Sequence, residues 1–317
     1  MLVNVAVAQV RAEKGEYERN LKAVGDLFSQ IRQDALDVDV LVLPETAMSG
    51  YFLEGGVVEV ARTAEELFGD LRREYADRCG AEARPLDVVV GFYEVCQGKH
   101  YNSCLYAELG REPRIRHVHR KVFLPTYGVF DEERFVSRGA RIDAFDTRFG
   151  TAAMLICEDA WHSLCGTIAA LKGAQIIYVV SASPGRGFRG PEVDSVRWWR
   201  NVVTSMAGEH NVFVVYSGLT GFEGGKGLAG ASMIVSPSGE VLAEAPILQE
   251  CILHCTLNMD DIAVVRAAFP MLQDLETCLA DLAAELDVVV SKRHHSPPVE
   301  PAAERRDRPS RGMPRGV

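Results

Sequence analysis

Short apolar runs with the composition of β-strands recur along most of the chain and limit what it can fold into. They are rich in Val and Ile and are bounded by Gly, Pro or polar residues, as buried strands usually are. The runs cover residues 3–10, 38–45, 86–95, 102–109, 151–157, 174–180, 211–218, 230–237 and 251–257. Amphipathic stretches typical of helices cover residues 16–33, 63–79, 160–171, 192–209 and 271–287. Strands that alternate with helices predict an α/β fold with buried sheets.

The domain organisation is simple. We find no internal repeat and no linker before the C-terminal tail, so residues 1–290 are expected to form one domain. The sequence SPSGE, residues 236–240, predicts a hairpin turn between two strands. Residues 291–317 are rich in Pro, Arg and Ser and almost free of apolar residues, which predicts a disordered basic tail.

Charge and cysteine usage exclude several classes of protein. The chain of 317 residues has a net charge of −10, which disfavours nucleic acids and anionic membranes as general partners. No apolar run approaches the roughly 20 residues that span a bilayer, and no basic segment precedes the first run as in a signal peptide. We therefore expect a soluble cytoplasmic protein. The eight cysteines include no Cys-x-x-Cys pair, which favours reduced thiols and disfavours a zinc site.

Three predicted strands end in side chains that can react. Glu45 ends DVLVLPE, Lys121 follows RIRHVHR, and Cys157 ends AAMLIC. A carboxylate, an ammonium and a thiol together suit nucleophilic acyl transfer, with the carboxylate as general base. The ammonium and the backbone N–H of Glu158 would stabilise the oxyanion, and a helix that opens at Asp159 or Trp161 would favour the thiolate. The Glu158 side chain is expected to point away, while Asp159 would cap that helix or hold neighbouring loops.

Each of these residues alone also fits a structural role. A thiol at the end of a strand is usually packed in the core, a Glu after Pro usually lies in a solvated turn, and a Lys in HRKV is usually a surface charge. Spacing alone does not bring the three together. The residues by themselves thus support a cysteine acyl-transfer enzyme only as one interpretation.

Three longer segments resemble the signature motifs of the nitrilase, or carbon–nitrogen hydrolase, superfamily. They are LVLPETAMSGY (41–51), HRKVFLPTYGVFDEERF (119–135) and MLICEDAW (154–161), and the resemblance covers residues 1–275. It implies a four-layer α-β-β-α sandwich that commonly pairs into homodimers or larger homo-oligomers. It also implies Glu45 as general base, Lys121 as oxyanion stabiliser and Cys157 as nucleophile. The family's reaction passes through a thioester and needs no metal or cofactor.

The resemblance also suggests a pocket and a substrate class. The family often has a second glutamate, for which FDEER offers Glu132 and Glu133, and we favour Glu132. Aromatic residues beside the motifs are expected to line the pocket or to pack in the core: Tyr51, Tyr127, Phe130 and Trp161.

The wording LPTYGVFDE and CEDAW is most similar to the glutamine-hydrolysing domain of NAD synthetases. Because the residues after 275 are too few for the ATP-pyrophosphatase domain of those enzymes, we expect a free-standing amidase of a small-molecule amide. A nitrile or an N-carbamoyl amine would use the same three residues. The alternative from another class is a non-catalytic binding subunit of the same fold.

One glycine-rich pattern imitates a nucleotide-binding loop. Gly185, Gly187 and Gly190 form G-x-G-x-x-G after a predicted strand, but SASP separates the first glycine from that strand, and no acidic residue ends the next strand. We interpret the segment as a loop over the acyl site. Arg186 and Arg189 would either contact a substrate carboxylate there or remain solvated.

Two other patterns favour structural roles. His117 and His119 alternate along a strand as metal ligands sometimes do, yet no third ligand motif accompanies them. The tryptophans of RWWR, residues 197–200, are expected to pack against the sheet or a partner subunit rather than on nucleic acid.

Overall fold

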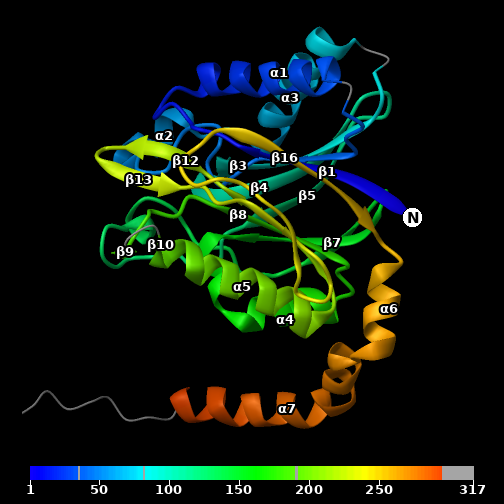
Figure 1. Ribbon diagram of the computed structural model, residues 1–317. Helices are drawn as coiled ribbons and strands as arrows, with labels where there is room; N and C mark the ends of the chain where they lie inside the picture. Colours follow the sequence, from blue (N-terminus) through cyan, green and yellow to red (C-terminus); the bar gives the residue numbers. More distant parts are fainter. Residues whose placement is uncertain (35, 81–82, 190–191, 295–317) are drawn as a thin grey trace, which may run out of the picture. The chain divides into compact units, whose positions relative to one another are not determined.

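Two six-stranded β-sheets lie face to face at the centre of residues 1–273 (Figure 1). The computed structural model describes residues 1–34, 36–80, 83–189 and 192–294. The first sheet has the order β16-β1-β2-β3-β4-β5 and the second β15-β14-β11-β8-β7-β6. The strands of the first sheet are β1 (Leu2–Gln9), β2 (Val40–Val42), β3 (Leu86–Cys96), β4 (Lys99–Leu109), β5 (Arg114–Arg120) and β16 (Cys251–Asn258). Those of the second are β6 (Ala144–Thr147), β7 (Gly150–Ile156), β8 (Ile176–Ser181), β11 (Phe213–Gly218), β14 (Met233–Val235) and β15 (Val241–Glu244).

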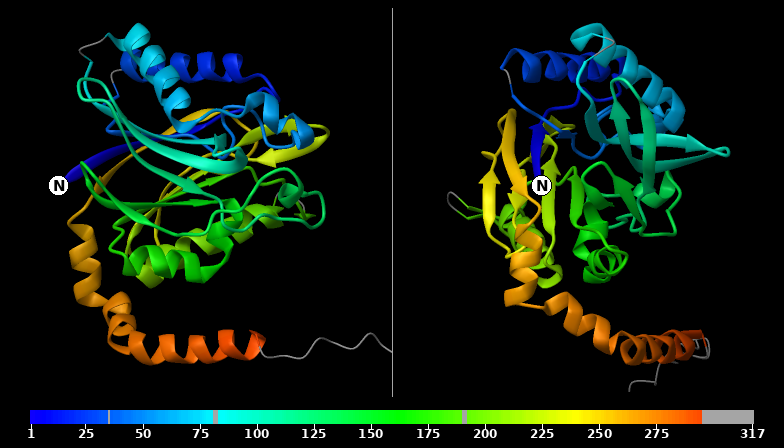
Figure 2. Two further views of the ribbon diagram at one scale, coloured as in Figure 1. Left: turned by 180° about the vertical axis from the view of Figure 1, so that it is seen from behind. Right: turned by 90° about the vertical axis from the view of Figure 1, so that its right-hand side faces the viewer.

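Two pairs of helices cover the outer faces of the sheets (Figure 2). α1 (Tyr17–Gln33) and α3 (Ala64–Cys79) pack on the first sheet, and α4 (Ser163–Leu171) and α5 (Asp194–His210) on the second. The buried side chains of α1 recur at helical spacing and form one apolar face: Tyr17, Leu21, Val24, Phe28 and Ile31. The layer order is therefore α-β-β-α, which confirms the predicted four-layer sandwich.

Burial on both faces explains why the strands are continuous apolar runs. Each sheet has a helix layer on one side and the other sheet on its second side, so residues that point either way are withdrawn from water. All six residues of β8 and all six of β11 are buried. Central pairs in both sheets are parallel, including β1 with β2 and β7 with β8.

All nine predicted strands are confirmed, and the hairpin at residues 236–240 joins β14 to β15. The sequence did not predict several short elements. They are β6, β9 (Phe188–Arg189), β10 (Glu192–Val193), β12 (Thr220–Glu223), β13 (Lys226–Ala229), α2 (Val57–Val60), α6 (Asp261–Ala268) and three 3-10 turns, η1 (Glu54–Gly56), η2 (Glu132–Arg134) and η3 (Cys157–Trp161). Most of these elements are too short or too rich in glycine to show a hydrophobic period.

The last helix is longer than predicted. α7 covers Met271–His294, whereas we expected it to end at residue 287 and the tail to begin at residue 291. Residues 274–317 form a second unit, and the predicted tail from residue 295 onward lies outside the described residues. None of the helices in the described ranges has the length and apolar character needed to cross a bilayer.

Candidate active site

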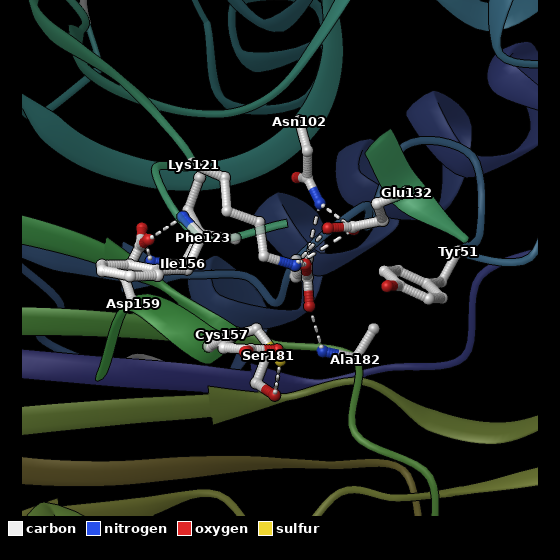
Figure 3. A network of polar contacts seen from close by, with 12 residues as sticks. Tyr51, Asn102, Lys121, Phe123, Glu132, Ile156, Cys157, Asp159, Ser181 and Ala182 are labelled. Atoms are coloured by element: carbon white, nitrogen blue, oxygen red, sulfur yellow. Dashed lines mark hydrogen bonds and ion pairs between the residues drawn. The ribbon is translucent and has the colours of Figure 1, made fainter. Parts of the chain in front are cut away.

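The three strand-end residues meet in one buried cluster between the sheets, in which Figure 3 labels Lys121 and Cys157. Glu45 follows β2, Lys121 follows β5, and Cys157 directly follows β7. Lys121 Nζ lies 2.8 Å from Glu45 Oε1, and both side chains are fully buried. Cys157 lies on the facing sheet, where the hydroxyl of Ser181 approaches its Sγ at 3.4 Å. The fold thus brings together the acid, the ammonium and the thiol that the sequence analysis singled out.

A second carboxylate and an amide complete the charged half of the cluster. Glu132 Oε1 lies 3.0 Å from Lys121 Nζ, so the ammonium contacts two carboxylates. Asn102 Nδ2 donates to Glu45 Oε1 at 2.8 Å and to Glu132 Oε1 at 2.9 Å (Figure 3). Of the two candidate glutamates, Glu132 is buried here while Glu133 is exposed. Sequence reasoning missed Asn102, which lies between Tyr101 and Ser103 near the polar start of β4, where no local pattern sets it apart.

Burial and pairing set the charges of this cluster. Burial by itself would lower the pKa of Lys121, but the charges of Glu132 and Glu45 raise that pKa well above its usual value. Lys121 therefore remains an ammonium. For Glu132, burial raises the pKa even though Lys121 acts in the opposite direction, and the charge of Glu45 adds to the rise. In the cluster, the Lys121 side chain thus stays protonated and contacts the carboxyl groups of both Glu45 and Glu132.

Cys157 occupies a turn with unusual backbone geometry. Its φ is 47°, in the left-handed region that non-glycine residues rarely adopt outside functional or strained sites. The 3-10 turn η3 begins at Cys157 itself, and the next α-helix begins only at Ser163. The expected favouring of thiolate by a helix N-terminus is therefore wrong. Burial raises the pKa of the thiol, and the charge of Glu45 raises it further, so the resting group is a thiol that needs a base.

Glu45 also connects the two sheets. Its Oε2 accepts a hydrogen bond from the backbone N–H of Ala182, just after β8, at 2.6 Å. The segment that carries Glu45 packs tightly on β3, where a Cβ at Gly91 would lie 2.5 Å from Glu45 Cα. Thr46, the next residue, has a φ of 51°. A glycine in β3 and a left-handed residue after Glu45 together allow the carboxylate to reach across to the second sheet.

Asp159 makes a second connection, in the opposite direction. It is fully buried and lies two residues after Cys157, and its carboxylate accepts the backbone N–H groups of Val122 and Phe123 at 3.0 and 2.9 Å. It also contacts His119 Nε2 at 2.9 Å. His119 precedes Lys121 by two residues, and Val122 and Phe123 directly follow it, so Asp159 contacts the chain both before and after Lys121. Of the two roles that the sequence left open for Asp159, the structure shows that of holding the neighbouring loop.

The aromatic residues proposed for the pocket separate into three groups. Tyr51 and Phe130 lie at the cluster, with ring centroids 5.9 Å apart and Lys121 Nζ 5.6 Å from the Tyr51 centroid. Tyr127 is half-exposed, and its hydroxyl donates to the Glu158 carboxylate at 2.9 Å. Trp161 lies elsewhere, against Trp198 and Trp199 of α5, beside a separate groove.

A cavity of about 280 Å³ adjoins the cluster. Glu132 and Tyr51 are among its lining residues, together with Phe52, Tyr93, Phe130 and Lys226. The hydroxyl of Tyr51 has no hydrogen-bond partner among the described residues although it is buried. A buried phenol without a partner can receive a polar group of a bound molecule.

The remaining sequence patterns have structural roles where they are described. Gly185 donates to Gly227 in the β12–β13 hairpin, Gly187 has a φ of 69°, and Gly190 lies outside the described residues. His117 stacks on Phe145 with ring centroids 4.7 Å apart. Trp199 stacks on Tyr216 of β11 at 4.6 Å, which confirms that this tryptophan packs against the sheet.

The family model for carbon–nitrogen hydrolases matches residues 4–267. This range includes both sheets and all the residues of the buried cluster. The chain therefore belongs to the carbon–nitrogen hydrolase family.

Curated relatives are about a quarter identical to the chain over the residues that align. The glutamine-dependent NAD(+) synthetase of Thermotoga maritima is 26% identical over 279 residues, which cover 87% of this chain and 45% of the synthetase. A probable nitrilase of Schizosaccharomyces pombe is 24% identical, covering 84% of this chain and 92% of that protein. The N-carbamoylputrescine amidase of Oryza sativa is 28% identical over 65% of this chain and 71% of its own length. The chain spans less than half the length of the synthetases.

Solved structures of the family share the fold. The carbon–nitrogen hydrolase of Helicobacter pylori superimposes with a TM-score of 0.77 at 21% identity, covering 88% of this chain and 99% of that one. An amidase of Nesterenkonia sp. AN1 gives a TM-score of 0.69 at 21% identity, covering 88% and 98%. At this level of identity the likeness establishes the nitrilase-type sandwich and leaves the substrate open.

Proposed function

We propose that the protein is a cysteine-dependent hydrolase that cleaves the C–N bond of a small amide through a thioester. The observation that carries this proposal is the buried meeting of Glu45, Lys121 and Cys157 at the ends of strands from two sheets. A structural cluster has no need for a thiol, a carboxylate and an ammonium withdrawn together from water, because burying charges is costly.

In the proposed first half-reaction, Cys157 Sγ attacks the amide carbon while its proton passes to Glu45. The carbonyl oxygen becomes an oxyanion, which the Lys121 ammonium and the backbone N–H of Glu158 stabilise. Glu45 then protonates the departing nitrogen as the C–N bond breaks, so ammonia or an amine leaves and a thioester remains. The raised pKa of Lys121 supports this assignment because a cation must persist through the cycle.

In the second half-reaction, water attacks the thioester and transfers its proton to Glu45. The C–S bond breaks, a carboxylic acid leaves, and the proton returns to Cys157. Glu132 and Asn102 would keep Glu45 and Lys121 in position during both steps. These side chains supply the base, the acid, the nucleophile and the oxyanion charge, so we propose no cofactor.

Two other substrate classes fit the same three residues. The similarity to a probable nitrilase and to an N-carbamoylputrescine amidase makes a nitrile and an N-carbamoyl amine the next candidates. A non-catalytic binding subunit of this fold is the alternative from another class. We favour catalysis because a binding protein gains nothing from a nucleophile paired with its base.

The test is ammonia release by wild type and by Cys157→Ala. The panel would contain glutamine, asparagine, aliphatic amides, N-carbamoyl amino acids and several nitriles. Cys251→Ala is the matched control, because Cys251 lies on β16, outside the cluster. We expect ammonia from wild type and from the control, and none from Cys157→Ala.

The same panel can contradict the proposal. Ammonia release by purified Cys157→Ala would remove the thiol from the mechanism. If wild type released none, and iodoacetamide failed to label Cys157 in the folded protein, the binding-subunit alternative would be favoured.

We further propose that the protein assembles into a homodimer or a larger homo-oligomer. Two large apolar side chains of the second helix layer, Leu164 and Trp198, are about half exposed. Light scattering of the purified protein would test this proposal, and a monomeric mass would contradict it.

A further inference from the structure

Two cations near the site, one on a loop and one at the start of a strand, form no ion pair with a carboxylate of the described residues. Arg186 follows β8 after a short extended segment, and Lys226 is the first residue of β13. Neither side chain forms an ion pair with a carboxylate of the described residues, whereas Arg78, Arg84 and Arg120 each do.

Both cations rest on aromatic rings. Lys226 Nζ lies 4.4 Å from the centroid of Phe52, and the Arg186 guanidinium carbon lies 5.3 Å from the centroid of Phe130. The two rings are nearly parallel, 15° apart in orientation, with centroids separated by 6.4 Å. A cation on the face of an aromatic ring keeps its charge while its position is restricted. The ring pair thus holds both charges in one region.

The two cations line the same cavity. It has a volume of about 380 Å³, and the rest of its lining is mainly apolar, including Val129, Pro184 and Leu248. No acidic residue of the described ranges is among its lining residues. A cavity that offers two positive charges and apolar walls suits an organic anion.

This cavity adjoins the buried cluster. Val129 and Lys226 line both this cavity and the 280 Å³ cavity, which Glu132 and Tyr51 of the cluster also line. Along the chain, Ala182 donates to Glu45, and Arg186 comes four residues later. Four extended residues span at most about 14 Å, so the backbone of Arg186 lies within about that distance of Ala182, the residue that contacts Glu45.

We propose that Arg186 and Lys226 form a carboxylate subsite, and that the natural acyl donor carries a carboxylate at the end opposite its scissile amide. This inference rests on the proposed function, because it assigns the substrate class of the same site. Arg186 would bind the two carboxylate oxygens and Lys226 would add a second charge. The apolar walls would exclude water and strengthen both contacts.

The experiment compares amides in matched pairs of equal chain length. The carboxylate-bearing amides are succinamate, glutaramate and adipamate, and their neutral partners are butanamide, pentanamide and hexanamide. We expect wild type to favour the best carboxylate-bearing amide over its partner at least tenfold in kcat/KM, mainly through KM. In the double variant Arg186→Gln and Lys226→Gln, this ratio should fall to near one.

Lys22→Gln is the charge-matched control, because Lys22 is exposed on α1 and removal of its charge leaves the subsite intact. The ratio should be unchanged in that variant. A wild-type ratio near one for all three pairs, or a tenfold ratio that survives in the double variant, would overturn the proposal.

A binding measurement separates failure of the subsite from failure of the proposed function. The rate at which iodoacetamide labels Cys157 would be followed with succinate, glutarate or adipate present, each compared with the matching neutral amide. If wild type hydrolyses no amide, yet a dicarboxylate slows labelling in wild type and not in the double variant, the subsite stands and amide hydrolysis fails. Equal labelling with both kinds of competitor would refute the subsite.

Discussion

The two sheets contribute different halves of the candidate site. The first sheet supplies a charged half in which Glu45, Asn102 and Lys121 are fully buried and bonded to one another. The second supplies Cys157, whose Sγ has one long contact, with the Ser181 hydroxyl at 3.4 Å. The charged half is therefore fixed by several hydrogen bonds, whereas the thiol has one hydrogen-bond contact among the described residues.

The halves are joined by two contacts that cross between the sheets in opposite directions. Glu45 of the first sheet reaches the backbone of Ala182 in the second. Asp159, beside Cys157, reaches the backbone on the far side of Lys121. Because each contact depends on how the two sheets pack, a change in sheet packing should also change how Glu45, Lys121 and Cys157 are aligned. Substitutions at Glu45, Gly91 and Asp159 should weaken the contacts between the two sheets in different places.

The largest effect is expected from Glu45→Gln. The change removes the proposed base and weakens the contacts of residue 45 with Lys121 and Ala182. Loss of a general base typically costs 10²–10⁴-fold, so we expect kcat to fall about 10³-fold with the circular dichroism spectrum unchanged. Kinetics on the best substrate of the panel would measure this. A folded variant that retains a tenth of wild-type kcat would show that another group takes the proton.

Gly91→Ala should be the next largest change, and it acts through packing. A Cβ at this position would lie 2.5 Å from Glu45 Cα and 2.6 Å from the carbonyl oxygen of Pro44, both backbone atoms that cannot rotate away. Overpacking of this kind costs about 1–3 kcal/mol, and here we expect the upper end, with activity lost because Glu45 shifts. Urea denaturation would give the change in unfolding free energy.

Gly69→Ala is the control for that experiment. Gly69 lies within α3, and a Cβ there would have no neighbour within 4 Å. Replacing an interior helix glycine with alanine should stabilise the protein by up to about 1 kcal/mol. If both variants were equally stable, the close approach of Glu45 to β3 would not be required by the fold.

Local patterns predicted an α/β fold with buried strands, whereas the four-layer sandwich and the joint role of Glu45, Lys121 and Cys157 came from the resemblance of three segments to the family's motifs. Buried strands are readable as apolar runs, and Glu45 and Cys157 lie where such runs stop, while Lys121 follows the more polar strand β5. Asn102 was not predicted, because it lies beside Ser103 near the polar start of β4, where no local pattern sets it apart. The left-handed backbone of Cys157 and the contact from Ala182 to Glu45 were not predicted either, because no local pattern encodes how one sheet lies on the other.

Trp161 illustrates the same limit. It lies four residues after Cys157, so proximity along the chain suggested the pocket. In the structure it packs on Trp198 and Trp199, because α5 covers the outer face of the second sheet and the turn η3 directs this side chain toward that helix. Closeness in sequence to a nucleophile does not determine on which side of a sheet a residue lies.

Asp159→Asn should reduce activity less than Glu45→Gln and Gly91→Ala do. An amide cannot accept all the hydrogen bonds that the carboxylate receives from Val122, Phe123 and Ile156. Lys121 would then be held less firmly relative to Cys157, and we expect kcat to fall about tenfold with KM within threefold, a loss of about 1.4 kcal/mol in the transition state.

Two further variants test whether the effect of Asp159→Asn comes from its contacts with the backbone beside Lys121. Asp146→Asn is the control, because Asp146 is exposed on β6 and, among the described residues, its side chain accepts one hydrogen bond, from the Thr151 hydroxyl at 3.3 Å. His119→Gln removes the imidazole partner of Asp159 while leaving the carboxylate, and its loss should be smaller. A rise in KM with unchanged kcat for Asp159→Asn would indicate that Asp159 acts on binding rather than on alignment.

The smallest effect concerns the thiol itself and its dependence on pH. Burial and the charge of Glu45 raise the pKa of Cys157 in the folded protein above its ordinary value. Without substrate, its labelling by iodoacetamide should therefore keep rising between pH 8 and 10, because the thiolate fraction is still increasing. The same thiol in urea-unfolded protein should level off earlier, near the ordinary cysteine pKa of about 8.5. A plateau below pH 8 in the folded protein would mean that the resting nucleophile is already a thiolate, and Glu45 would then be needed only to protonate the leaving nitrogen and to activate water.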